Sequence, residues 1–160
     1  MFPIEWENPD RHYFVLFSDA AMEKMLALRQ QNPGSLEAGG VLVGYRRNPH
    51  LEITDVTTPG AKDIQARTRF KRKDPSHRKF VERQWVSSSR LIDYLGEWHT
   101  HPEMHPHPSG LDIGECIRVT LTYPRKPILE VVVGTNSMWV GSYGLVRMEA
   151  LKPILSEQPG

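Results

Sequence analysis

The sequence has very little cysteine and very little net charge. Its 160 residues include one cysteine, which excludes an internal disulfide and fits a reducing cytoplasm. The 20 basic and 19 acidic side chains give a formal charge of +1, so nothing in the overall charge favours a nucleic acid or an anionic membrane as partner. No apolar run has the length of a signal peptide core with its basic flank, or of a transmembrane helix. We therefore expect a cytoplasmic protein.

The length and composition favour one compact domain. A chain of 160 residues that is 39% hydrophobic can bury a single core and leaves no room for a second one. We expect one domain over residues 1–160, with its core at about residues 13–148, a short N-terminal extension and a loose C-terminal tail.

The most informative pattern is a pair of histidines followed by a serine and an aspartate. His99 and His101 are two residues apart, and Ser109 and Asp112 follow them. If the residues before His99 form a strand, both imidazoles project to the same face and can reach one ion. Two histidines and one carboxylate suit zinc and leave its fourth position to water, as in a catalytic site. The sequence therefore predicts a catalytic zinc site.

Two more histidines leave an alternative ligand set open. His105 and His107 lie in residues 102–108, where three prolines indicate an extended loop. Either imidazole could in principle bind the ion, although the strand geometry favours His99 and His101.

A further pattern lies upstream, where Glu37 precedes the glycine-flanked stretch 39–44. Together with the stretch 96–102, Gly-Glu-Trp-His-Thr-His-Pro, it resembles the JAMM (MPN+, JAB) metalloprotease family over about residues 13–148. In this sequence Glu97, Trp98 and Thr100 depart mildly from the common pattern, and none of them is a catalytic group. The resemblance implies a role for each of five residues: zinc ligands at His99, His101 and Asp112, a general acid/base at Glu37, and support of the tetrahedral intermediate at Ser109.

The resemblance also implies the reaction. Family members hydrolyse the amide bond after the C-terminal glycine of a ubiquitin-like modifier or conjugated protein. Zinc lowers the pKa of a bound water from about 15.7 to roughly 7. Glu37 would take the proton and return it to the leaving amine, while Ser109 helps to stabilise the charged oxygen. The chain most resembles bacterial deconjugating peptidases of CBASS antiphage operons, with E1/E2-like proteins and their target as expected partners.

Two other functions remain open. A processing peptidase would mature a ubiquitin-like or sulfur-carrier precursor with the same chemistry. A non-catalytic MPN scaffold would bind partners without a metal, but the complete set of five site residues argues against it.

The implied fold class is α/β (α+β), with a mixed, curved sheet flanked by helices. Hydrophobic periodicity predicts a helix with Ser18 as its N-cap running to about residue 31, and a loop at 59–72. The other expected elements are strands at 13–17, 39–46, 51–57, 91–98, 128–134, 137–143 and 145–148, and helices at 75–88 and 109–122.

The predicted loop ends in a basic run beside Phe70. A solvated loop is sufficient to explain these charges. The resemblance implies instead a docking surface for an acidic or extended segment, because the family clamps a substrate tail along a strand near this position. Arg67, Arg69 and Phe70 are therefore candidate substrate-binding residues. A nucleic-acid patch would need more basic and aromatic residues than this run offers.

Overall fold

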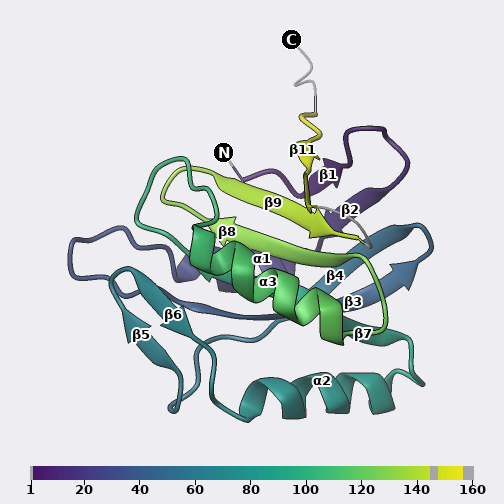
Figure 1. Ribbon diagram of the computed structural model, residues 1–160, viewed down its shortest axis with the longest axis horizontal. Coiled ribbons are helices and arrows are strands. Elements are labelled where there is room, and N and C mark those ends of the chain that lie inside the picture. The colour runs from purple at the N-terminus through teal and green to yellow at the C-terminus, as the bar shows by residue number, and fades with distance from the viewer. Residues whose placement is uncertain (1, 145–147, 157–160) are drawn as a thin grey trace.

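A nine-stranded mixed sheet forms the centre of the computed structural model, which describes residues 2–144 and 148–156. Its strand order is β10-β9-β8-β7-β3-β4-β2-β1-β11, and β5 and β6 form a separate two-stranded sheet (Figure 1). The strands are β1 (Glu5–Glu7), β2 (Phe14–Phe17), β3 (Gly39–Arg47), β4 (His50–Val56), β5 (Ile64–Ala66), β6 (Arg69–Lys71), β7 (Ile92–Thr100), β8 (Ile128–Val133), β9 (Met138–Tyr143), β10 (Met148–Ala150) and β11 (Lys152–Pro153). The expected mixed sheet is confirmed.

The central strands bring distant parts of the sequence together. Strand β3 pairs antiparallel with both β4 and β7, whereas β7 runs parallel to β8. The start of β3 therefore meets the end of β7, with Gly39 opposite His99, and Val132 of β8 is the neighbour of His99 on the other side. These strands are mostly buried, as expected where helices cover both faces.

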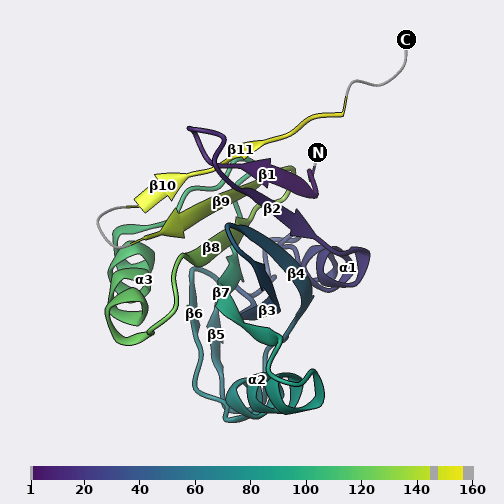
Figure 2. The same cartoon turned by 90° about the vertical axis from the view of Figure 1, so that its right-hand side faces the viewer.

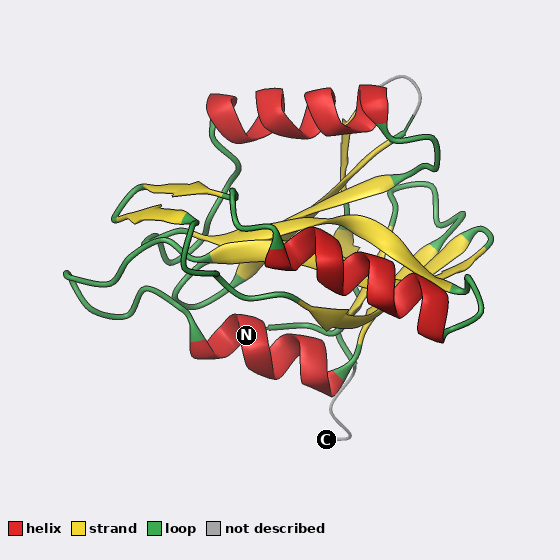
Figure 3. Ribbon diagram, turned by 90° about the horizontal axis from the view of Figure 1, so that it is seen from below, coloured by secondary structure: helices red, strands yellow, loops and turns green. Residues whose placement is uncertain are grey.

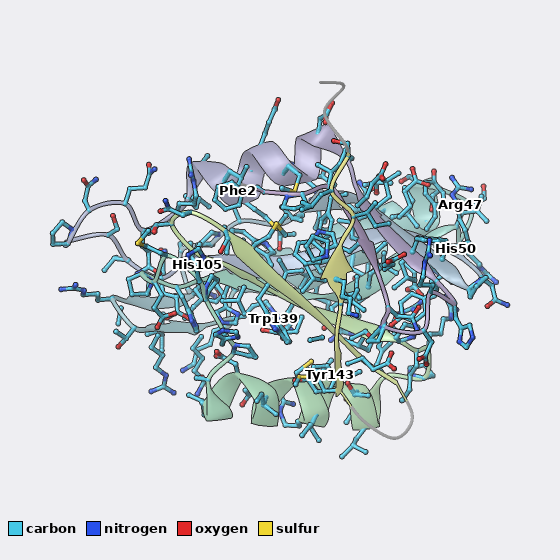
Figure 4. The ribbon with its side chains drawn as sticks, turned by 90° about the horizontal axis from the view of Figure 1, so that it is seen from above. Phe2, Arg47, His50, His105, Trp139 and Tyr143 are labelled. Atoms are coloured by element: carbon cyan, nitrogen blue, oxygen red, sulfur yellow. The ribbon has the colours of Figure 1, made fainter. Side chains whose placement is uncertain are left out.

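In residues 2–144 and 148–156, three helices flank the sheet: α1 (Asp19–Ala27), α2 (Ser76–Ser87) and α3 (Gly110–Thr122). Helices α1 and α3 lie on opposite sides of the sheet (Figures 2 and 3), and α2 packs against β7 and β3, below the sheet in the view of Figure 2. Tyr143 of β9 packs with Cys116 of α3 in a small core cluster, and its side chain lies close to that helix (Figure 4). Within the described residues, no helix has the length and apolar character needed to span a membrane.

The first helix ends earlier than its periodicity predicts. Ser18 is its N-cap, as expected, but the helix stops at Ala27 instead of about residue 31. The chain then turns, and the side chain of Gln30 is buried. This side chain accepts a hydrogen bond from Thr100 Oγ1 at 2.9 Å and donates one to the carbonyl of Arg67 at 2.7 Å. These long-range hydrogen bonds override the local helical pattern.

The prediction of a loop at 59–72 is wrong, because this segment contains the β5–β6 hairpin. The hairpin is short and its residues are mostly exposed, so it carries little of the alternating hydrophobicity that identifies a strand. The tail also differs from the expectation: β10 pairs with β9, and β11 pairs with β1, a strand that the sequence did not predict. The strand expected at 145–148 lies, except for Met148, outside the described residues.

Candidate active site

Three ligand atoms converge where β7 meets the start of α3. His99 Nε2 lies 3.0 Å from His101 Nε2, and Asp112 Oδ2 lies 3.1 Å from the first and 3.2 Å from the second. Four residues, Glu37, His99, His101 and Asp112, have ligand atoms within 4.8 Å of one another. Strand β7 continues to Thr100, so His99 and His101 project to the same side as the two-residue spacing predicts.

Carboxylates fix the outer nitrogens of both imidazoles. His99 Nδ1 lies 3.0 Å from Glu130 Oε1, a buried side chain of β8, and His101 Nδ1 lies 3.0 Å from Glu103 Oε2, which is exposed. A carboxylate on the outer nitrogen orients a metal-binding imidazole and leaves the inner nitrogen for the ion. Burial disfavours a charged His99, but its hydrogen bonds with Asp112 and Glu130 raise its pKa to about 10. Carboxylates of Asp112 and Glu130 therefore stand on both sides of the His99 ring.

Asp112 is held by the cap of α3. The Ser109 hydroxyl accepts a hydrogen bond from the Asp112 backbone N–H at 3.1 Å, and Asp112 Oδ2 accepts one from the Ser109 N–H at 2.7 Å. This reciprocal capping box turns the carboxylate toward the histidines. Despite burial, which raises the pKa of Asp112, its hydrogen bonds with His101 and His99 hold that pKa well below the usual range.

Glu37 lies just before β3 and is 4% exposed. Its backbone N–H donates to the Ala66 carbonyl at 2.8 Å, and the next residue, Ala38, donates its N–H to Thr100 Oγ1 at 2.9 Å. Burial raises the pKa of the Glu37 carboxyl to about 7, against the opposing influence of His99 and His101. A group with this pKa can both take and return a proton near neutral pH.

The ligand set fits zinc. Zn–N distances of 2.0–2.1 Å and tetrahedral angles would place neighbouring ligand atoms about 3.3 Å apart. The separations of 3.0–3.2 Å among His99 Nε2, His101 Nε2 and Asp112 Oδ2 are close to this value. His105 and His107 are exposed and do not belong to the described metal-binding group, and His105 Nδ1 lies 3.0 Å from Ser137 Oγ instead.

A cleft of about 380 Å³ opens beside the cluster. Residues of β3, β7 and β8 form its floor, the β6 strand of the β5–β6 hairpin forms one wall, and α3 forms the other. Arg69 and Phe70 line the hairpin wall, whereas Arg67 does not line the cleft. A Cβ on Gly39 would lie 2.6 Å from the Phe70 ring, so the glycine lets the wall approach the floor closely.

Comparison with known proteins agrees with this geometry. The family model of prokaryotic homologs of the JAB domain matches residues 18–146. The chain belongs to this family. A CD-NTase/cGAS isopeptidase of Escherichia coli (strain TW11681) is 38% identical to this JAB domain over 130 residues, which are 81% of each chain. A CD-NTase/cGAS isopeptidase of Pseudomonas aeruginosa (strain BWHPSA011 / Pa011) is 35% identical over 140 residues, 87% of this chain and 89% of the relative.

The fold of the JAB domain also matches a solved structure. The solution structure of a Desulfitobacterium hafniense protein superposes with a TM-score of 0.61 and 20% identity, over 90% of this chain and 94% of that one. This similarity supports the fold alone.

Sequence reasoning missed Glu130. It lies in the run Ile128–Val133, where it is the one charged residue among buried apolar neighbours. A lone carboxylate in such a strand needs a partner, because burying an unpaired charge is costly. That signal could have marked Glu130 as functional, but only the parallel pairing of β7 with β8 identifies His99 as its partner.

Proposed function

We propose that this JAB domain is a zinc-dependent isopeptidase that hydrolyses the amide bond after the C-terminal glycine of a ubiquitin-like modifier or a conjugated protein. The observation that carries the proposal is the meeting of Glu37 with His99, His101 and Asp112 beside a cleft that His99 and Asp112 line. The names of the two relatives support conjugates of a CD-NTase as substrates, and hence a role in a CBASS-like antiphage system.

Each residue of the cluster has a separate part in the proposed reaction. His99 Nε2, His101 Nε2 and Asp112 Oδ2 would hold the ion, which when bound supplies Lewis acidity and makes water acidic enough to lose a proton near pH 7. The Glu37 carboxylate takes the proton from the attacking water as the new C–O bond forms. It then delivers this proton to the amine nitrogen as the C–N bond breaks, which releases a free amine and a carboxylic acid that loses its remaining proton to solvent.

Ser109 and the hairpin wall complete the proposal. The Ser109 hydroxyl oxygen caps α3, and its proton is available to stabilise the negative oxygen of the tetrahedral intermediate. Arg69 and Phe70 would contact the substrate along the cleft, with Arg67 further out. The partners we propose are E1/E2-like proteins and their conjugated target in the cytoplasm, a location supported by the single, buried thiol of Cys116.

The substrate linkage decides between the proposal and its main alternative. A CD-NTase joined through its C-terminal glycine to a lysine side chain is compared with the same protein fused to a linear reporter. A deconjugase cleaves the isopeptide with the higher kcat/KM. Cleavage of only the linear fusion would favour a processing peptidase that matures a ubiquitin-like or sulfur-carrier precursor.

The scaffold alternative makes a different prediction. A non-catalytic MPN domain would cleave neither substrate at any zinc concentration, although it could still bind the conjugate. The complete ligand set argues against this alternative, because Glu37, His99, His101 and Asp112 bring their ligand atoms within 4.8 Å of one another.

A further inference from the structure

A second buried polar cluster lies away from the metal site. The imidazole of His77, in the first turn of α2, is 0% exposed, as is the carboxylate of Asp63. His77 Nε2 lies 2.6 Å from Asp63 Oδ2, and His77 Nδ1 lies 2.5 Å from Thr57 Oγ1. None of these three residues lines the cleft or belongs to the metal-binding group.

Asp63 closes the base of the hairpin. Its Oδ2 accepts the N–H of Gly60, which precedes β5, at 2.7 Å. Its Oδ1 accepts the N–H groups of Lys73 and Asp74, which follow β6, both at 2.7 Å. One carboxylate thus joins the two outer ends of the hairpin that forms a wall of the cleft, and α2 follows directly along the chain (Figure 1).

Thr57 links the same cluster to the floor of the cleft. Its Oγ1 accepts the N–H of Val41, in β3, at 2.8 Å. Its carbonyl accepts the indole N–H of Trp98, the residue before His99, at 2.9 Å. Since Oγ1 already accepts one hydrogen bond, its own proton is free to be donated to His77 Nδ1, and His77 Nε2–H donates to Asp63. An unbroken chain of hydrogen bonds runs from floor to wall.

We propose that His77 is a positioning residue that fixes the hairpin wall against the floor of the cleft. Its loss releases the wall and weakens substrate binding, while the metal centre stays intact. The order Asp-His-hydroxyl is also that of a nucleophilic triad. A substrate in the cleft does not reach Thr57 Oγ1, however, so the cluster positions and does not react.

The primary test measures hydrogen exchange on the zinc-loaded protein and needs no substrate. His77→Leu removes both hydrogen bonds, and His77→Gln retains an N–H donor for Asp63. Thr57→Val, which is isosteric, removes the hydroxyl that bonds both Val41 and His77. It replaces His77→Leu in the experiment if that variant does not fold. Glu82→Gln is the control, because Glu82 pairs with Arg78 on the exposed face of the same helix.

We expect amide exchange across residues 64–71 to accelerate about tenfold in His77→Leu and Thr57→Val, and less in His77→Gln. Strands β7 and β8 and the zinc content should match the wild type. Equal acceleration of exchange in the hairpin and in the core strands would indicate general destabilisation and would overturn the proposal. Unchanged exchange in the hairpin would overturn it as well.

A kinetic arm rests on the proposed function. With the CD-NTase conjugate as substrate, His77→Leu should raise KM about tenfold and His77→Gln by less, and both should leave kcat near the wild-type value. A fall in kcat at unchanged KM would contradict positioning of the wall. If the wild type cleaves nothing while hairpin exchange still accelerates selectively, the proposed function fails and the anchoring of the hairpin by His77 stands.

Discussion

The metal cluster and the hairpin wall are built in opposite ways. His99 and His101 are buried at the end of a central strand and have carboxylate partners, and the buried Glu37 lies just before β3. The β5–β6 hairpin is a separate two-stranded sheet whose residues are mostly exposed, and it is held by hydrogen bonds at its base, through Asp63, and near its turn, where Glu37 and Gln30 bond the carbonyls of Ala66 and Arg67. The comparison shows two ways of placing functional groups, since the reacting groups are held within buried central strands and the wall depends on hydrogen bonds from outside its own small sheet.

Removal of the acid/base should have the largest effect. Glu37→Ala should lower kcat by about 10²–10⁴-fold, the usual contribution of a positioned general acid/base, with zinc still bound. The measurement is kcat together with zinc content by atomic absorption. Glu23→Ala, an exposed carboxylate of α1, is the matched control and should leave both unchanged. A fully active Glu37→Ala protein would remove Glu37 from the mechanism.

The second-largest effect concerns zinc affinity and the two carboxylates that contact the outer nitrogens of the histidines. Glu130→Gln should weaken zinc binding about 10–100-fold, because Glu130 is buried and orients His99. Glu103→Gln should cost less, since Glu103 is 59% exposed and water can replace its contact with His101. Competition with a chelator measures both affinities. Equal losses would show that burial of the partner carboxylate does not matter.

The junction between floor and wall gives a third test. Gly39→Ala would place a Cβ 2.5 Å from the Trp98 carbonyl and 2.6 Å from the Phe70 ring, so one of them must move. We expect a loss of about 1–3 kcal/mol in the free energy of unfolding, measured by urea denaturation. Gly34→Ala, which meets nothing within 4 Å, is the control. An unchanged stability would mean that the wall is not held against the floor.

The smallest effect concerns the wall itself. Arg69→Ala should raise KM a few-fold, because one exposed charged contact contributes only a small interaction free energy. Arg67→Ala should leave KM unchanged. The difference follows from Arg69 lining the cleft and Arg67 lying outside it. Steady-state kinetics on the CD-NTase conjugate measure both, and equal values for the two variants would argue against selection by the wall.

The same contrast explains what the sequence could predict. His99, His101 and Asp112 follow from one short pattern, because strand alternation and a helix cap position them locally. Glu130 and His77 escaped prediction, because their partners lie 31 and 14 residues away and only the folded sheet identifies them. The hairpin escaped for a different reason: its exposed residues carry no hydrophobic period.

The most direct test of the account is a zinc titration of cleavage. Metal-free protein receives zinc in steps, and the rate of amide hydrolysis is followed on a CD-NTase linked to a lysine side chain through its terminal glycine. The account predicts a rate that rises from zero and levels off at one zinc ion per chain. Cleavage that needs no zinc, or no cleavage when one zinc ion is bound, would contradict it.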